Sequence, residues 1–406
     1  MTRHQRKTLY FLFGGASSFA ASFYSNYLLF LLRVDFGFGN RDNLAVSALN
    51  GLVYCVGSWQ SGRFAQRFGC HTSLRVSFVG VCICLLAGMV LPPVWAKVAT
   101  FAGWMLAICF TWPALEALIT EGEPPSEIPR LVGIYNITWA SSAAMAYLVG
   151  GAFFEHLGKA SLFWLPVTIH LGELLTLIWL ERQPVVTEPP IPPVPASHIP
   201  EAVAFKQPVS PATFLKMAWL ANPFAYVAMN TVLSVIPGLA HKFELTVAQS
   251  GLFCSIWLFA RFSAFVLLWR WTGWHYRFRW LLMAFLALIA GFLMILLAPG
   301  LWLVALGQIV FGLAVGLIYY SSLFYSMDVG DTKGEHGGLH EAAIGAGNFL
   351  GPAIGAAALH FAPANPNAST WAVGGVLLVG LTALIWLRRQ HQSALARSNG
   401  SVPPRS

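Results

Sequence analysis

The sequence predicts an all-α polytopic membrane protein with twelve transmembrane helices in two six-helix bundles. Three observations support this prediction: the composition, a regular series of apolar segments, and a proline-rich stretch midway along the chain. Of the 406 residues, 57% are apolar and only 10% are charged. Soluble domains typically carry about 25% charged residues. The composition therefore excludes an ordinary soluble protein, and it equally excludes a disordered or collagen-like chain.

Twelve apolar segments are long enough to cross a membrane, for which a helix needs roughly 20 residues. The first six segments are residues 10–32, 43–61, 76–92, 98–119, 131–154 and 161–180. The second six are residues 217–239, 246–269, 280–299, 301–325, 339–360 and 371–387. Backbone polar groups in lipid must be satisfied within their own segment, so each of these segments is predicted to be a helix.

A proline-rich segment separates the two sets of six. Residues 184–211 contain nine of the 24 prolines, and proline cannot continue a helix. The predicted parts are an N-terminal bundle (1–181), a cytoplasmic linker (182–212), a C-terminal bundle (213–390) and a flexible cytoplasmic tail (391–406). A second role for the linker, as a ligand of proline-recognition domains, stays open. Asn26 and Asn230 match at an offset of 204 residues, a weak sign that one bundle duplicated the other.

Basic residues are distributed unequally between the loops on the two sides. If both termini are cytoplasmic, 18 of the 24 Lys and Arg residues lie on the cytoplasmic side and five on the outer side. The remaining one, Arg261, lies inside a segment. Cytoplasmic loops of membrane proteins are enriched in Lys and Arg, so we expect a multi-pass plasma-membrane protein with both termini cytoplasmic. The net charge of +8 then reflects topology rather than a nucleic-acid partner.

The cysteines and the N-terminus give no sign of other chemistry. Five of the six cysteines fall in apolar runs and Cys70 lies in a basic loop, so we expect no disulfides, no metal site and no cofactor. Arg3, Arg6 and Lys7 precede an apolar segment of full spanning length. We expect that segment to remain as the first helix rather than to be cleaved as a signal peptide.

The loop after the second segment carries a motif, Gly62-Arg-Phe-Ala-Gln66-Arg67-Phe-Gly69, followed by His71 and Arg75. It resembles the signature loop of the major facilitator superfamily, in which a glycine, three residues, an aspartate, an arginine, any residue and a glycine precede basic residues. Gln66 stands where the family has aspartate, so its contact with Arg67 is weaker than a charged pair. The resemblance assigns a gating loop to Gly62, Gln66, Arg67, Gly69, Arg75 and Arg130.

The eleventh segment resembles the same superfamily through its glycines and Pro352, between Gly345 and Gly355. Small residues at such spacing let neighbouring helix backbones approach closely. The fifth segment departs from the family pattern, because Tyr147 stands where proline would be.

The resemblance implies secondary active transport of a small organic solute by alternating access around a central site, with the protein acting as a monomer. No ATP-binding glycine-rich loop is present, so the driving force is an ion gradient or the gradient of the substrate. A proton is weakly favoured over sodium, and the direction of transport stays open. The alternatives are a sensor that binds without transport and a membrane enzyme, for which His336, His340 and Glu341 form the nearest polar cluster.

Four charged residues lie inside the segments, where charge is expensive and commonly functional: Glu116, Glu173, Arg261 and Glu341. Arg261 either binds an anionic group of the substrate or forms an ion pair with Glu341. Glu116 either extends toward Arg130 or carries a coupling proton. For Glu173, near His170, packing inside the bundle is favoured over coupling.

Polar and aromatic residues in the segments complete the predicted site. Their polar groups must be satisfied by protein, water or ligand. In the superfamily, the first, fourth, seventh and tenth helices most often surround the substrate. Hydrogen bonding between helices is the alternative role. The candidates of this kind are Asn26, Tyr27, Asn136, Trp139, Asn230, Tyr319 and Tyr320.

Overall fold

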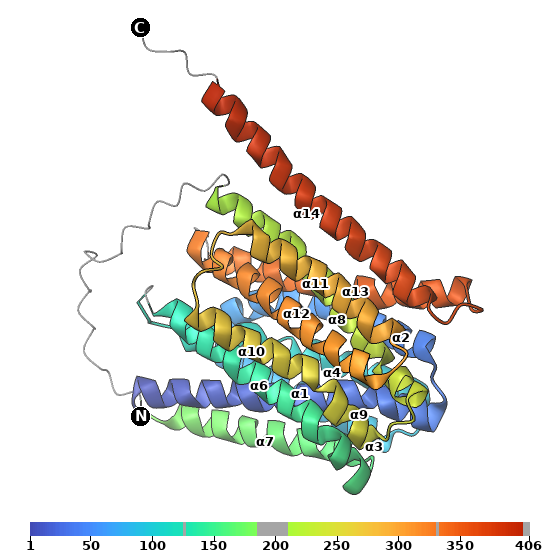
Figure 1. The fold of residues 1–406 in the computed structure, drawn as a ribbon. Coiled ribbons are helices and arrows are strands. Elements are labelled where there is room, and N and C mark those ends of the chain that lie inside the picture. The colour runs from blue at the N-terminus through green and yellow to red at the C-terminus, as the bar shows by residue number, and fades with distance from the viewer. Residues whose placement is uncertain (125–126, 185–209, 330–332, 401–406) are drawn as a thin grey trace.

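The computed structural model describes residues 1–124, 127–184, 210–329 and 333–400. These residues form helices joined by short connections (Figure 1). Most of the predicted linker, residues 185–209, and the end of the predicted tail, residues 401–406, lie outside the described residues. The prediction of an all-α membrane fold with twelve spans is confirmed by the helices described below.

The N-terminal bundle contains six spans, the fourth of which is divided in two. Its helices are α1 (Arg3–Phe36), α2 (Asn40–Phe68), α3 (Cys70–Val90), α4 (Val94–Ile108), α5 (Trp112–Thr120), α6 (Ile128–His156) and α7 (Ser161–Arg182). Helices α4 and α5 form one span with a break at 109–111, immediately before Pro113. Proline lacks the backbone N–H that an uninterrupted helix would use there.

The C-terminal bundle also contains six spans, with the second of them divided. Its helices are α8 (Pro211–Lys242), α9 (Val247–Cys254), α10 (Ile256–Arg270), α11 (Phe278–Leu297), α12 (Leu301–Val329), α13 (Lys333–Phe361) and α14 (Ala368–Gly400). The division between the ninth and tenth spans falls at Pro299-Gly300, as the sequence predicts.

Local sequence signals fix both ends of α1. Thr2 caps α1, accepting a hydrogen bond from the backbone N–H of Gln5, and the Thr2 backbone N–H in turn donates to Gln5 Oε1. This reciprocal pair satisfies two amides that the helix itself leaves free. Helix α1 ends at Gly37, whose φ of 68° is the left-handed conformation that glycine adopts without strain.

Nine spans in the described residues are long and apolar enough to cross a membrane. The other three, α1, α2 and α13, are more polar. Helices α2 and α13 pack against each other more extensively than any other pair of helices in the described part of the chain. A helix that faces another helix needs less apolar surface than one that faces lipid, which explains the polarity of this pair.

The two bundles meet along a seam. The N-terminal bundle contributes α2 and α6 to it, and the C-terminal bundle contributes α8, α9, α10 and α13. Across it, α13 packs against α2, α9 and α10 pack against α6, and α8 packs against α2 (Figure 1). We call the side at which α1 begins and α7 ends the terminal side, and the opposite side the far side. On the terminal side, the N-terminal amine donates to the Pro184 carbonyl at 2.8 Å.

The seam is closed on the far side. A Cβ atom added to Gly151 near the end of α6 would overlap the backbone of Val247 and Ala248 at the start of α9. The Ala248 amide also donates to the Glu155 carboxylate at 3.0 Å. On the terminal side, α5 packs against α1, α2, α3 and α6 of its own bundle, and Gly133 near the start of α6 approaches the Trp269 side chain of α10. The bundles are therefore in close contact at the far end of α6.

Candidate functional site

The centre of the candidate site is Arg261, which lies in α10 and faces aromatic side chains from both bundles. Its guanidinium carbon lies 4.7 Å from the ring centre of Trp139 in α6, 5.0 Å from that of Tyr319 in α12 and 5.4 Å from that of Phe265 in α10. Only 4% of Arg261 is exposed. Aromatic faces attract a cation, most strongly where water is excluded. The three rings therefore form a cage that holds the guanidinium at the seam.

Arg261 forms no ion pair with the described residues. Its Nη1 atom faces the sulfur of Met229 at 3.7 Å, whereas Nε and Nη2 are buried and donate to none of the described groups. One of the two roles expected for Arg261 was an ion pair with Glu341. Arg261 and Glu341 do not form that ion pair in the described structure. Glu341 instead accepts a hydrogen bond from the Tyr54 hydroxyl at 2.5 Å.

Asn136 links two rings of the cage. Its Oδ1 atom accepts hydrogen bonds from Trp139 Nε1 at 2.8 Å and from the Tyr319 hydroxyl at 3.4 Å. Asn136 and Trp139 are three residues apart on α6, a spacing that places both on one face of the helix. The structure thus brings four predicted candidates, Arg261, Asn136, Trp139 and Tyr319, into one cluster.

Two carboxyl groups lie near this cluster, one from each bundle. Glu116 of α5 and Glu341 of α13 lie within electrostatic reach of each other across the seam. Tyr226 and Tyr319 are each within electrostatic reach of both carboxyls and of Arg261. Glu116 is nevertheless not covered by other residues of the described chain.

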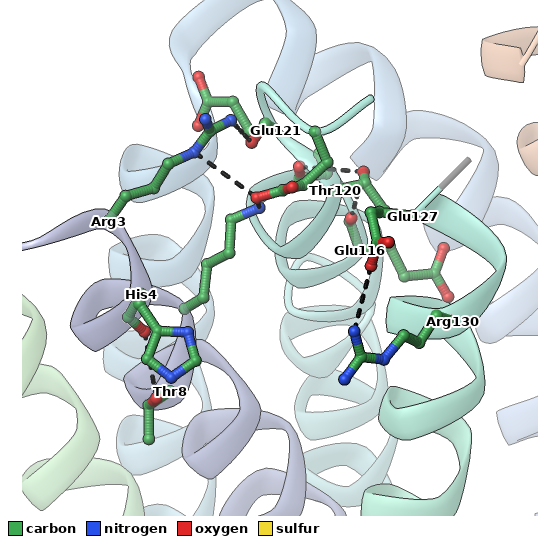
Figure 2. A network of polar contacts seen from close by, with 11 residues as sticks. Arg3, His4, Thr8, Glu116, Thr120, Glu121, Glu127 and Arg130 are labelled. Atoms are coloured by element: carbon green, nitrogen blue, oxygen red, sulfur yellow. Dashed lines mark hydrogen bonds and ion pairs between the residues drawn. The ribbon is translucent and has the colours of Figure 1, made fainter. Parts of the chain in front are cut away.

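Glu116 does not meet Arg130, which the sequence offered as one of its two possible partners. Arg130 instead forms an exposed ion pair with Glu127 three residues earlier, with 3.4 Å between Nη1 and Oε2 (Figure 2). Arg130 thus lies at the start of α6 with Glu127 as its partner, whereas the charged group within electrostatic reach of Glu116 is Glu341.

Two contacts of the site were missed by sequence reasoning. Tyr54, the partner of Glu341, lies in an apolar run where a tyrosine resembles an ordinary membrane-interface anchor. Met229, the neighbour of Arg261, resembles any other core residue. The only available signal was that charges buried in a membrane need partners. For the enzyme alternative, the side chains of His336 and His340 lie outside the described residues.

The two predicted asparagines of the first helix in each bundle take part in hydrogen bonds within the protein. Asn26 Nδ2 donates to the Ser22 carbonyl at 2.6 Å, and Asn230 Nδ2 donates to the Tyr226 carbonyl at 3.3 Å. Each bond connects residues four apart on one helix. Asn230 also donates to Asn348 Oδ1, which ties α8 to α13.

The two remaining tyrosine candidates lie outside the cage. Tyr27 is fully buried and donates to the Tyr147 carbonyl at 2.6 Å, which ties α1 to α6 on the far side. Tyr320 is half-buried, and its ring centre lies 5.9 Å from those of Phe265 and Trp274. Hydrogen bonding between helices, the alternative role for these candidates, describes Tyr27, whereas Tyr320 packs against aromatic rings of its own bundle.

Most residues of the predicted gating loop lie at or beside the turn between α2 and α3, whereas Arg130 lies apart from them at the start of α6. Gly69 has a φ of 88° and joins the two helices directly. Arg75 forms an ion pair with Glu181 of α7, inside the same bundle. Arg67 lies over the Phe68 ring, with 5.2 Å between the guanidinium carbon and the ring centre. The other members, Gly62 and Gln66, lie in the last turns of α2.

Ionic contacts also join the start of α1 to the end of α5 on the terminal side. Lys7 Nζ lies 2.5 Å from Glu123 Oε1, and Arg3 Nη2 donates to the Glu121 carbonyl at 2.7 Å (Figure 2). Arg3 Nε lies 3.7 Å from the same Glu123 carboxylate. These contacts fix the terminal-side end of α5, the helix that carries Glu116.

A sequence model of the Major Facilitator Superfamily matches residues 9–330. The chain belongs to the major facilitator superfamily. The match confirms the superfamily that the loop after α2 resembles, and it extends over most of the length of the chain. No curated protein matches the sequence.

Solved structures of transporters share the fold of this superfamily member at low sequence identity. A peptide transporter, POT, is 14% identical with a TM-score of 0.70, covering 96% of this chain and 95% of its own. The nucleoside transporter NupG is 14% identical with a TM-score of 0.68, covering 94% and 98%. A bacterial homologue of the human lysosomal transporter Spinster, in an inward-facing and unoccupied conformation, is 16% identical with a TM-score of 0.61, covering 97% and 93%. At these identities the likeness shows the fold alone.

Proposed function

We propose that this protein is a secondary active transporter that moves a small organic solute across the plasma membrane by alternating access. The observation that supports this most directly is the cage around Arg261. Trp139 and Asn136 come from one bundle, and Arg261, Phe265 and Tyr319 from the other. A site built from both bundles changes its exposure when the bundles rock against each other, as alternating access requires.

The terminal side faces the cytoplasm in this proposal, because most loop Lys and Arg residues lie there. The close contact of the bundles at the far side then supports a conformation that opens inward. The protein acts as a monomer, because the seam lies between two bundles of one chain.

Glu116 and Glu341 carry the coupling proton in this proposal. Carboxyl groups bind and release protons, and these two lie within electrostatic reach of each other across the seam. Tyr54 holds one oxygen of Glu341 at 2.5 Å. Both carboxyls also interact with Tyr226 and Tyr319, which border Arg261. A proton bound to these carboxyls therefore changes the electrostatic potential at the aromatic cage around Arg261.

The test is transport by the purified protein in proteoliposomes, with candidate solutes taken from a thermal-shift screen. We expect wild-type protein to accumulate a solute when a pH gradient is applied. Glu341→Gln and Glu116→Gln should lose accumulation driven by the gradient yet keep exchange of labelled for unlabelled solute, because exchange needs no net proton movement. Glu127→Gln, an exposed carboxyl at the start of α6, is the matched control and should accumulate solute as the wild type does.

Two outcomes would contradict the proposal. Binding without movement of any solute would indicate a sensor rather than a transporter. Accumulation by both glutamine variants at the wild-type level would show that the carboxyls do not carry the coupling proton.

A further inference from the structure

We propose that the solute is a small organic anion whose carboxylate or phosphate group binds Arg261 inside the aromatic cage. This inference rests on the proposed transport function and names the substrate class of the same site. Two observations support it. Arg261 is a buried cation without a counter-charge among the described residues, and it is surrounded by aromatic side chains at the seam of the bundles.

The first step concerns the charge of Arg261. A buried guanidinium is costly unless it is paired and its donors are satisfied. The thioether of Met229 is only a weak acceptor, and the Tyr226 hydroxyl, which also hydrogen-bonds with the guanidinium, carries no negative charge to balance it. Nε and Nη2 donate to none of the described residues. The aromatic faces offset part of the cost, but they accept no strong hydrogen bond.

The second step concerns the nearby carboxyls, which are the resident alternatives to a ligand. Glu341 has an oxygen committed to Tyr54, and Glu116 interacts with Glu341. Neither forms an ion pair with Arg261 in the described part of the chain. The positive charge is therefore left for an incoming group.

The third step concerns the chemistry that would be recognised. A guanidinium presents planar, forked N–H donors that match the paired oxygens of a carboxylate or a phosphate. The ring faces of Trp139, Phe265 and Tyr319 around the charge favour a solute with an apolar body, as is usual for small-molecule sites. An oxyanion on Nε and Nη2 would replace the sulfur contact of Met229 with strong hydrogen bonds.

The test is a thermal-shift panel of purified protein with matched compounds that share one skeleton: benzoate, benzamide and benzylamine, with longer aryl and alkyl homologues of each. Phosphate monoesters form a second arm and inorganic phosphate a third. A ligand that binds the folded state raises the melting temperature. We expect carboxylates or phosphate monoesters to stabilise the wild type, with amides, amines and inorganic phosphate having no effect.

Three variants connect this selectivity to Arg261. Arg261→Gln should weaken binding of the stabilising anion at least tenfold. Arg261→Lys should retain part of it, because the charge remains but the fork is lost. Arg270→Gln, the same change at an exposed position on the same helix, should bind as the wild type does.

The inference is overturned if neutral amides stabilise the wild type as strongly as carboxylates, or if no anionic compound stabilises it. It is equally overturned if folded Arg261→Gln keeps wild-type affinity for the anion. If Arg261→Gln fails to fold, the comparison of carboxylates with amides on the wild-type protein still tests whether the site prefers anions. Anion binding without transport would instead count against the proposed function, and transport of a neutral solute through proteoliposomes would count against this inference alone.

Discussion

Glu173 and His170 form a buried acid–base pair inside the N-terminal bundle. His170 Nδ1 lies 2.7 Å from Glu173 Oε2, and the Ser17 hydroxyl of α1 donates to Glu173 Oε1 at 2.9 Å. His170 and Ser17 are fully buried, and Glu173 is 4% exposed. These contacts join α7 to α1. They explain how an acid in this span avoids the lipid, and they fit the packing role that the sequence favours for it.

We predict that Glu173→Ala destabilises the protein and that Glu173→Gln does so less. Alanine leaves two buried polar groups without partners, at a cost of about 1–3 kcal/mol each. Glutamine can still accept from Ser17 and donate to His170. Thermal unfolding in detergent measures the difference, and transport per folded molecule should stay near the wild-type level. Lost transport at an unchanged melting temperature would instead assign Glu173 a role in coupling.

At the scale of residues, the sequence identified the charged members of the site better than their partners. Arg261, Glu116 and Glu341 stand out because charge in a membrane is rare. Tyr54 does not stand out, because it is one of 11 tyrosines in a chain that is 14% aromatic. Which oxygen meets which donor depends on helix rotation, and a single sequence does not determine that rotation.

The close contact of α2 with α13 depends on glycines at the scale of helices. A Cβ atom on Gly51 of α2 would overlap the backbone of Asn348 in α13, and a Cβ on Gly345 of α13 would overlap Cys55 of α2. Gly347 and Gly351 bring α13 equally close to α8. The close approach predicted from the glycines of the eleventh segment is thus present on two sides of α13.

We predict that Gly51→Ala destabilises the described conformation, because the added methyl group meets backbone that cannot rotate away. Overpacking of this kind costs about 1–3 kcal/mol. Gly172→Ala is the control, since a Cβ there meets no atom within 4 Å, and its melting temperature should equal or slightly exceed that of the wild type. Equal melting temperatures for the Gly51 variant and the wild type would show that the two helices separate at little cost.

At the scale of helices, the sequence predicted all twelve spans, including the division at Pro299-Gly300. It did not predict the breaks inside the fourth and eighth spans. The fourth breaks before Pro113, and the eighth at Ser255, whose hydroxyl bonds to the Leu252 carbonyl at 2.7 Å. Hydrophobic runs continue through both breaks, so composition alone does not reveal them.

At the scale of the whole molecule, the two bundles are in direct contact at the far side. The Glu155 carboxylate of one bundle accepts from the Ala248 amide of the other at 3.0 Å. Transport by alternating access requires this contact to open in every cycle. Composition and loop charge predict the number of helices and their orientation, but they carry no information about which end of the seam is closed.

We predict that a reversible cross-link across this contact stops transport. Cysteines at Glu155 and Ala248, in a chain whose six native cysteines are replaced, would be joined by a short bis-methanethiosulfonate reagent and released by reductant. The control pair is Asp35 with Lys159, which form an ion pair within the N-terminal bundle. Joining that pair leaves the bundles free to rock, so transport should continue. If the Glu155–Ala248 cross-link forms completely and uptake is unchanged, then the far-side contact does not open during transport, and a rocking mechanism around Arg261 is excluded.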